Sequence, residues 1–205
     1  MAEFIEESGQ LESNTIGVFR TSATVKGGKR FSFGAMVVVG DRRGRIGLGY
    51  GKAKEVPPAI EKAQKDGKKS LVPIKLFKGT IPHAVEGRYL ASRVRLIPAA
   101  PGTGVVAGAT VRAVLELVGV TDCLTKVYGS ANKKNLAKAT IEGLGRLRMK
   151  EEVEALRGIG IETTEVERIV SRDMGASTGT SPDANGIAQS DEAQPTAGKQ
   201  TATAS

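Results

Sequence analysis

Residues 31–40 read Phe-Ser-Phe-Gly-Ala-Met-Val-Val-Val-Gly, an apolar run that contains three consecutive valines. β-Branched residues favour strands, and a short apolar run bounded by turn residues is typical of a buried strand. Ile16 and Val18 recur at the spacing of a half-buried strand, and residues 45–51 follow a basic hairpin loop at 41–44. The start of the chain therefore predicts three consecutive strands.

A helix is predicted next, over residues 52–69, because Val56, Ile60 and Ala63 fall at i, i+4 and i+7. Two prolines are tolerable there because they lie in the first turn. The order β-β-β-α ends at a boundary near residues 78–80. Beyond it, strands and helices alternate, as expected for an α+β protein whose second part is a compact α/β module. The predicted strands are 81–85, 93–98 and 122–128, and the predicted helices are 109–118, 132–146 and 151–156.

The chain is thus expected to contain five segments. They are a flexible acidic N-terminus (1–10), a β-β-β-α domain (11–78), a second domain (79–160), an acidic extension (161–174) and a disordered C-terminal tail (175–205). The tail prediction rests on composition. Gly, Ser, Thr, Ala, Pro and Gln dominate it, and such a segment cannot bury enough apolar surface to offset the entropy of ordering.

Positive charge is concentrated in the middle of the chain. The formal net charge is +8, but residues 14–78 contain 15 Lys and Arg against 4 acidic residues, and residues 79–150 contain 11 against 4. A concentrated cationic surface attracts polyanions, and nucleic acid is the commonest of these. An anionic membrane is the rival partner. It would require a basic amphipathic helix with large apolar residues opposite the charges, and the basic stretches contain none.

Two basic loops are candidate RNA contacts. The first has the sequence Lys26-Gly27-Gly28-Lys29-Arg30, in which two glycines make the tip adaptable and three cations can contact phosphates. The alternative is a solvated hairpin whose lysines serve solubility. Phe31 and Phe33 share one strand face, which favours core packing over base stacking. The second loop contributes Arg42, Arg43 and Arg45. Further RNA-binding candidates are Arg20, Lys52, Lys54 and Arg93. Arg88 and Arg95, with Lys133, Lys134 and Lys138, suggest that the second domain also contacts RNA.

The glycine-rich run at residues 47–52 resembles a nucleotide-binding loop but fails on spacing. A dinucleotide fingerprint would need a glycine where Lys52 stands, and a P-loop would need glycine at Ile46 and Ser or Thr at Ala53. The glycines could still permit a close backbone approach to a phosphate, with Lys52 and Lys54 flanking a helix N-terminus. The alternative is a purely structural strand end.

Little in the sequence supports catalysis. His83 is the one histidine and Cys123 the one cysteine, so no histidine cluster, multi-cysteine metal site or internal disulfide can form. No serine or cysteine has a recognisable base partner. The chain is therefore expected to be a non-enzyme without cofactor, metal or small-molecule substrate. Its acidic start and the absence of a long apolar run indicate a cytoplasmic protein rather than a secreted or membrane one.

Two long runs, at residues 25–63 and 97–144, resemble the family of bacterial small-subunit ribosomal protein five, and the likeness extends over about residues 11 to 160. The resemblance implies a double-stranded-RNA-binding-like β-β-β-α domain followed by an α/β (β-α-β-α) domain. It also implies a position at the back of the small subunit. There the protein would bind ribosomal RNA, steady the head against the body near the messenger RNA entry site, and influence decoding accuracy. The chain continues past the usual end of the family, and the acidic stretch 162–173 has no usable counterpart.

Partner contacts follow from the same resemblance. The loop at residues 26–30 would reach head-side ribosomal RNA. Gly102, Thr103, Gly104 and Arg112 would face ribosomal protein four, and the segment from Tyr128 through Asn132 to Asn135 would lie near ribosomal protein eight. Two alternatives stay open from the residues alone. One is a free-standing double-stranded-RNA binder that uses the β-β-β-α module, and the other is a nucleotide-dependent enzyme.

Overall fold

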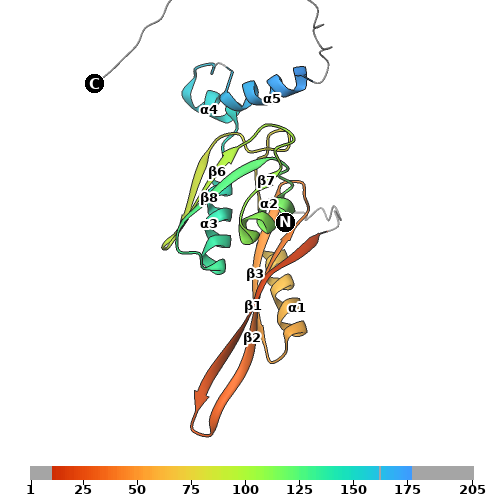
Figure 1. Ribbon diagram of the computed structural model, residues 1–205, viewed down its shortest axis with the longest axis vertical. Coiled ribbons are helices and arrows are strands. Elements are labelled where there is room, and N and C mark those ends of the chain that lie inside the picture. The colour runs from red at the N-terminus through yellow and green to blue at the C-terminus, as the bar shows by residue number, and fades with distance from the viewer. Residues whose placement is uncertain (1–10, 162, 177–205) are drawn as a thin grey trace, which may run out of the picture.

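The computed structural model describes residues 11–161 and 163–176, which form two four-stranded sheets with helices packed on them (Figure 1). The first sheet and its helix comprise β1 (Glu12–Val25), β2 (Gly28–Gly40), β3 (Arg45–Ala53), α1 (Val56–Lys69) and β4 (Val72–Pro73). The second comprises β5 (Val85–Tyr89), β6 (Ser92–Pro98), β7 (Val105–Val106), α2 (Ala109–Val118), β8 (Cys123–Gly129) and α3 (Lys133–Gly145). Helices α4 (Lys150–Arg157) and α5 (Glu165–Ala176) follow. The predicted α+β class is confirmed.

The first sheet is antiparallel in the order β1-β2-β3-β4, and the apolar run of β2 lies at its centre. Successive side chains of a strand point to opposite faces. Val37 and Val39 accordingly pack with Ala59 and Ala63 of α1, whereas Val38 packs into the larger core on the other face. Both faces of this part of β2 are therefore covered, as its sequence predicts.

The glycines of β3 allow α1 to lie directly on the sheet. A Cβ atom at Gly49 would collide with the carbonyl oxygen of Ala63, and one at Gly51 with that of Ala59. The predicted start of the helix at residue 52 is wrong, because Lys52 is still paired with β2 and α1 begins only at Val56. Pairing with β2 keeps Lys52 and Ala53 in the strand, although the local spacing of apolar residues predicts a helix there.

The second sheet has the order β5-β6-β8-β7, with β7 parallel to β8 and the other pairs antiparallel. Helix α2 has the predicted bounds. The strand predicted over residues 81–85 is wrong, because β5 spans Val85–Tyr89. Ile81 is fully buried in the core although its backbone is irregular, so it carries the apolar signal of a strand without being one. With the short β7, the second half reads β-β-β-α-β-α rather than β-α-β-α.

One continuous core joins the two halves. Val38 and Ile46 of the first sheet belong to the same buried cluster as Leu96 of β6 and Leu117 of α2. Hydrogen bonds reinforce this junction: the Arg42 backbone N–H donates to the Leu117 carbonyl at 3.0 Å. Helices α2 and α3 of the second half therefore pack against the first sheet, so that the two halves form one body from which the β1–β2 hairpin projects (Figure 1).

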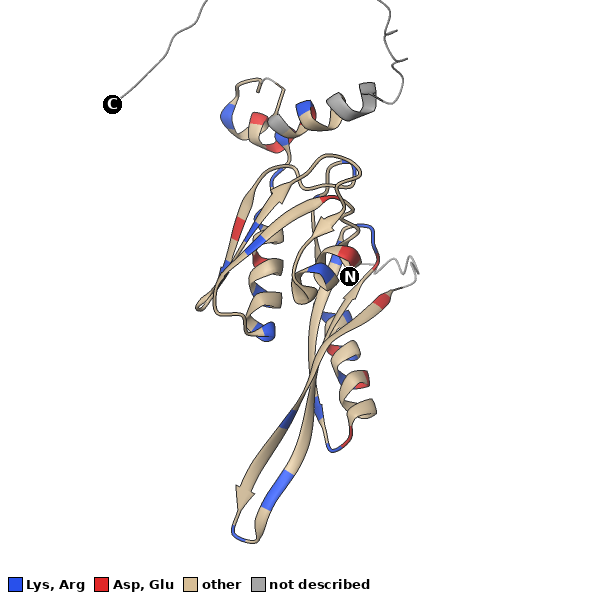
Figure 2. Cartoon of the chain, in the orientation of Figure 1, with Lys and Arg blue, Asp and Glu red and all other residues tan. Residues whose placement is uncertain are grey.

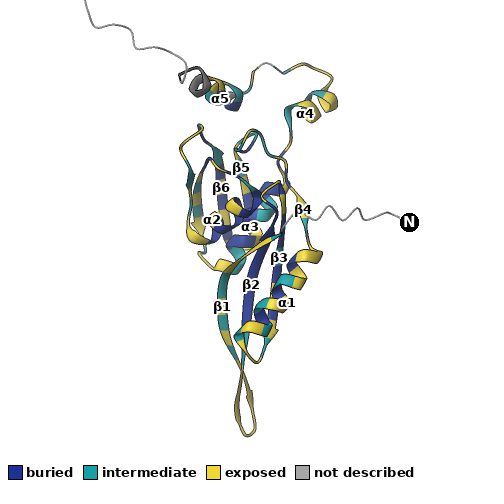
Figure 3. Cartoon of the chain, turned by 90° about the vertical axis from the view of Figure 1, so that its right-hand side faces the viewer, coloured by how far each residue is buried: buried dark blue, intermediate teal, exposed yellow. Residues whose placement is uncertain are grey.

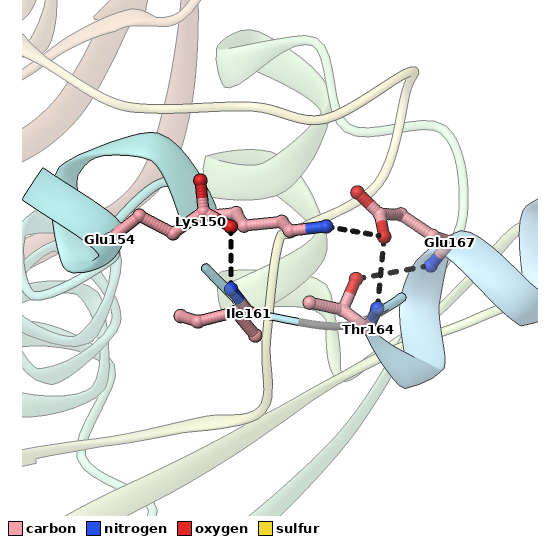
Figure 4. A network of polar contacts seen from close by, with 5 residues as sticks. All are labelled: Lys150, Glu154, Ile161, Thr164 and Glu167. Carbon is pink, nitrogen blue, oxygen red and sulfur yellow. Dashed lines mark hydrogen bonds and ion pairs between the residues drawn. The ribbon is translucent and has the colours of Figure 1, made fainter. Parts of the chain in front are cut away.

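Much of the predicted acidic extension is helical. Thr164 caps α5, since its backbone N–H donates to the Glu167 carboxylate at 2.9 Å while its hydroxyl accepts from the Glu167 N–H at 3.4 Å (Figure 4). Lys150 pairs with the same carboxylate at 3.3 Å. Val166 and Val170 are buried. The hydrogen bond from Thr164 is the largest influence on Glu167 and lowers the pKa of its carboxyl group.

The predicted flexible N-terminus at residues 1–10 lies outside the described residues. The same holds for residues 177–205, which make up most of the predicted disordered tail; its first two residues, 175 and 176, belong to α5.

Candidate nucleic-acid interface

The β1–β2 hairpin extends beyond the body as a two-stranded ribbon (Figures 1 and 3). All residues from 22 to 31 are exposed, and a turn at Lys26 and Gly27 joins the strands. Residues 13–40 contain four basic residues and no acidic residue. The four are exposed and form no ion pair with any described residue; they are Arg20, Lys26, Lys29 and Arg30 (Figure 2).

The predicted basic loop is shorter than expected. Residues 28–30 belong to β2, so only Lys26 and Gly27 form the connection, and Gly28 takes a φ of +133° that suits glycine. Lys29 pairs with Thr24 and Arg30 with Ala23 across the ribbon. Because neighbouring residues of a strand point to opposite faces, these two cations project on opposite sides. The ribbon thus presents positive charge on both faces and at its tip.

Phe31 does not pack into the core, so the expectation that it shares a buried face with Phe33 is wrong for this residue. Its side chain is 48% exposed, and the guanidinium of Arg20 lies 3.8 Å from the centroid of its ring. The two stack because Phe31 pairs with Ser22, two residues along β1 from Arg20. Phe33, which lies nearer the body, is only partly exposed.

The second basic loop is docked on the protein and only partly available. Arg42 pairs with Glu12 at 2.7 Å, and Arg45 pairs with Asp41 at 2.6 Å. Asp41 also accepts hydrogen bonds from the backbone N–H groups of Arg43 and Arg45. Burial by itself would raise the pKa of Asp41, but these hydrogen bonds and the Arg45 charge outweigh it and lower that pKa. Among the three predicted arginines, only Arg43 forms no ion pair within the described chain.

The glycine-rich run does not form the phosphate loop considered above. Gly47, Gly49 and Gly51 are buried beneath α1, so the close approach that they permit is that of a helix backbone. Lys52 and Lys54 are both exposed, but they precede the helix N-terminus instead of flanking it. Lys52 lies opposite Gly34 on the sheet face away from α1.

Arg93 lies on the outer face of the second sheet. It is exposed, and its strand neighbours in register are Arg88 on β5 and Tyr128 on β8. Arg95 lies on the same face and is opposite Lys126. Lys126 was not singled out from the sequence. Alternation along the predicted strand 122–128 places Lys126 on an outward face. Its position opposite Arg95 depends on the pairing of β8 with β6, which joins distant parts of the chain and is not visible in the sequence.

The residues predicted to face ribosomal protein four lie together at one edge of the second sheet. Gly102 and Gly104 have positive φ values of 87° and 76°. The Gly104 N–H donates to the buried carboxylate of Asp122 at 2.9 Å, which fixes the end of the turn. Thr103 is exposed at the turn itself. Arg112 is exposed on α2 and donates to the carbonyl oxygen of Val105, next to the turn, at 3.2 Å.

Tyr128 and Asn132 differ in their surroundings. Tyr128 is 45% exposed and available for a contact. Asn132 caps α3, because its side chain accepts from the Lys134 N–H at 3.1 Å. Lys134 in turn places its ammonium 4.9 Å from the Phe19 ring centroid and 4.3 Å from that of Tyr50, so the start of α3 is fixed against the first sheet. Asn132 thus has a structural role of its own.

The one histidine and the one cysteine are both engaged structurally. His83 Nε2 accepts from the Arg148 N–H at 3.1 Å, and its other ring nitrogen lies 3.0 Å from the Ala84 carbonyl oxygen. Burial raises the pKa of the Cys123 thiol to about 11. Within the described ranges, no group of three or more His, Cys, Asp and Glu side chains could hold a metal ion, and no helix is long and apolar enough to cross a membrane.

Similarity to known proteins decides the family. Residues 11–75 match the family described as ribosomal protein S5, N-terminal domain, and residues 87–157 match ribosomal protein S5, C-terminal domain. The chain belongs to the ribosomal protein S5 family. The first match corresponds to the first sheet with α1, and the second runs from β5 through α4. The resemblance stated from the sequence is therefore confirmed.

Individual S5 relatives are similar over most of their length. The small ribosomal subunit protein uS5 of Thermus thermophilus is 56% identical over 147 residues, which cover 72% of this chain and 91% of the relative. That of Rhodopirellula baltica is 52% identical over 153 residues, or 75% and 86%. That of Aliivibrio fischeri strain MJ11 is 48% identical over 163 residues, or 80% and 98%. S5 proteins are structural components of the small ribosomal subunit and not enzymes, which confirms the non-catalytic expectation.

Proposed function

We propose that this S5 protein binds small-subunit ribosomal RNA at the back of the body, steadies the head against the body, and contributes to translational accuracy together with ribosomal protein four. It would act in the cytoplasm, as part of the ribosome. The names of its relatives support a place in the small ribosomal subunit. The positive charge of the β1–β2 hairpin supports a contact with RNA.

The observation that carries RNA binding is the combination of projection and charge in the hairpin. Residues 22–31 are exposed, and the whole stretch 13–40 contains no acidic residue to neutralise its cations. Lys29 and Arg30 point to opposite faces, and Lys26 lies at the tip. Phosphates could therefore be contacted on either side of the ribbon, as is needed between two RNA segments. Such contacts give affinity without base selectivity.

The protein contacts are proposed for two other surfaces. Gly102, Thr103, Gly104 and Arg112 would face ribosomal protein four, and the segment around Tyr128 and Asn132 would lie near ribosomal protein eight. Messenger RNA would pass nearby at the entry site. The first assignment is supported by the exposure of Thr103 and of Arg112, since Arg112 donates to the carbonyl oxygen of Val105 next to the turn.

The test is a triple substitution, Lys26→Ala, Lys29→Ala and Arg30→Ala, measured by equilibrium binding to small-subunit ribosomal RNA over a range of salt. Affinity should fall, and the log–log salt dependence should flatten by roughly 0.7–0.9 for each phosphate that is no longer bound. The matched control replaces Lys75, Lys150 and Arg146, which are already paired with acidic side chains. An unchanged slope in the hairpin variant, with wild-type affinity, would mean that the hairpin is merely solvated.

A cellular measurement separates this proposal from a free-standing RNA binder. Nearly all of the protein should sediment with small subunits and with ribosomes that contain them. Recovery mainly in free fractions would contradict the proposal.

A further inference from the structure

The second sheet has one covered face and one open face. Helix α3 packs on the first, where Gly87, Val94 and Leu96 are buried. The open face, formed by β5, β6 and β8, carries four exposed cations and one exposed acid. The cations are Arg88, Arg93, Arg95 and Lys126, and the acid is Glu86.

The strand register places like charges directly opposite one another. Arg88 is the Cα partner of Arg93, and Arg95 is the Cα partner of Lys126. Side chains of such cross-strand partners lie on the same face with Cβ atoms about 4.5–5.5 Å apart, and like charges in this position destabilise a sheet. Glu86 lies opposite Arg95, yet none of the five charged residues forms an ion pair within the described chain.

A repulsive arrangement on an open sheet is relieved when an anionic partner covers it. We propose that this open face is a second ribosomal-RNA contact, in which a phosphodiester backbone crosses β5, β6 and β8 and neutralises the opposed pairs. The inference rests on the proposed function, because it assumes that the protein binds ribosomal RNA. It joins Arg88, Arg93 and Arg95, which the sequence suggests as RNA contacts, with Lys126 in one surface of four cations on three strands.

The shape of the charged surface favours a polyanionic chain over an isolated acidic side chain. Adjacent strands lie about 4.8 Å apart, and residues on one face of a strand repeat about every 6.7 Å, so the cations form a two-dimensional array. A single carboxylate could neutralise one pair only. The exposed ring of Tyr128 lies beside Arg93 and adds a flat surface suited to a base or ribose.

The test uses the expectation that the opposed cations lower the stability of the sheet but raise its affinity for RNA. Replacing Arg95 and Lys126 by Thr removes one opposed pair and introduces residues that favour strands. Thermal unfolding at low salt should shift upward by about 1–4 °C, because a repulsion is removed. The gain should shrink at high salt, where the repulsion is screened. Binding of small-subunit ribosomal RNA should weaken, with a salt slope flatter by roughly 1.4–1.8 if both residues contact phosphates.

Two further variants of the protein are measured in the same experiment. The control variant, Lys75→Ala with Arg146→Ala, removes two cations that are already paired with acids, and should keep nearly the wild-type slope. The hairpin variant described above is measured in the same assay. Weakened RNA binding by the hairpin variant, with wild-type affinity and slope for the Arg95 and Lys126 variant, would overturn this inference and leave the proposed function standing.

A different outcome would overturn both. If the wild-type protein shows no salt-dependent affinity for the ribosomal RNA, neither the hairpin nor the sheet is an RNA contact. If the Arg95 and Lys126 variant keeps RNA affinity but no longer binds a neighbouring ribosomal protein, the open face is a protein interface, and the RNA assignment is wrong.

Discussion

The ammonium group of Lys134, in the first turn of α3, lies 4.3 Å from the centroid of the Tyr50 ring on β3. The same group lies 4.9 Å from the ring of Phe19 on β1. One lysine of the second half therefore contacts two aromatic rings of the first sheet. This contact lies beside the continuous core and helps to set how the two sheets are oriented.

Replacing Lys134 by Ala should consequently destabilise the protein by about 1 kcal/mol, the usual size of a partly desolvated cation–π contact. Chemical denaturation measures this free energy of unfolding. The control is Lys133→Ala, since Lys133 is adjacent and exposed but has no aromatic partner within the described residues. Equal effects of the two substitutions would show that the aromatic contacts contribute nothing specific.

Gly49→Ala should be severely destabilising, because the new methyl group would meet the carbonyl oxygen of Ala63 and the amide nitrogen of Gly67. The helix would have to move away from β3, and we expect a decrease of about 3 kcal/mol or more in the free energy of unfolding. Gly27→Ala is the matched control, since a Cβ atom there would have no neighbour within 4 Å. It should change stability by no more than about 0.5 kcal/mol. A tolerated Gly49→Ala would mean that α1 is not held as closely as the structure has it.

Asp41 should make stability depend on pH in the acid range. Its pKa in the folded protein is below the ordinary value of 3.8. The carboxylate therefore stabilises the fold fully above that ordinary value, and this contribution is lost as the pH falls through the lower folded-state pKa. Asp41→Asn should cost about 1–3 kcal/mol at pH 7, and the difference from wild type should shrink below about pH 4.

The control for Asp41 is Glu61→Gln, which removes an exposed carboxylate of α1 without an ion pair in the described structure. Its free energy of unfolding should follow that of wild type across the same pH range. A pH-independent difference between wild type and Asp41→Asn would argue that the side chain acts through shape and not through its charge.

Cys123 should be almost unreactive in the native protein. Its side chain is fully buried, and a pKa of about 11 leaves only a very small thiolate fraction at pH 8. Labelling by a thiol-specific reagent at pH 8 should be at least about 100-fold slower than in denaturant. Rapid native labelling would show that the junction between β6 and β8 opens readily.

The proposed interface with ribosomal protein four predicts an effect on decoding. Arg112→Glu should alter the frequency of misreading in a reporter assay while subunit assembly stays largely intact, because the exposed side chain is not part of the core. Arg157→Glu makes the same charge change at an exposed position on α4 that is not assigned to this interface, and should leave misreading unchanged. Normal misreading by the Arg112 variant would place the interface elsewhere.

Local patterns in the sequence predicted most elements of the fold. The valine run of β2 and the helical spacing of α2 are local signals, and both predict the observed elements correctly. The errors arose where distant parts of the chain meet. Lys52 is held in β3 by its pairing with Gly34, and Ile81 is buried by residues far along the chain. No pattern within a short window contains this information.

The candidate interface, like the fold, is predictable from the sequence only where the signal is local. Charge and glycine content predicted the tip at Lys26, but the length of the ribbon was missed, because an exposed hairpin has no buried face and therefore no apolar alternation. The strand face that Phe31 shares with Phe33 predicts core packing, yet Phe31 is exposed and stacks with Arg20. The opposed pair of Arg95 and Lys126 depends on strand register, which only the folded structure defines.

The projecting ribbon also has a mechanical consequence. Between residues 22 and 31 every side chain is exposed, so the tip has no apolar layer beneath it, whereas β2 from Ala35 onward is buried on both faces. A two-stranded hairpin without a core is only marginally stable by itself. The hairpin is therefore rigid where it joins the body and flexible at its tip. The tip can bend and twist with the RNA that we propose it contacts, while the base of the hairpin keeps its shape, so motion between two parts of an assembly can be absorbed without straining the core.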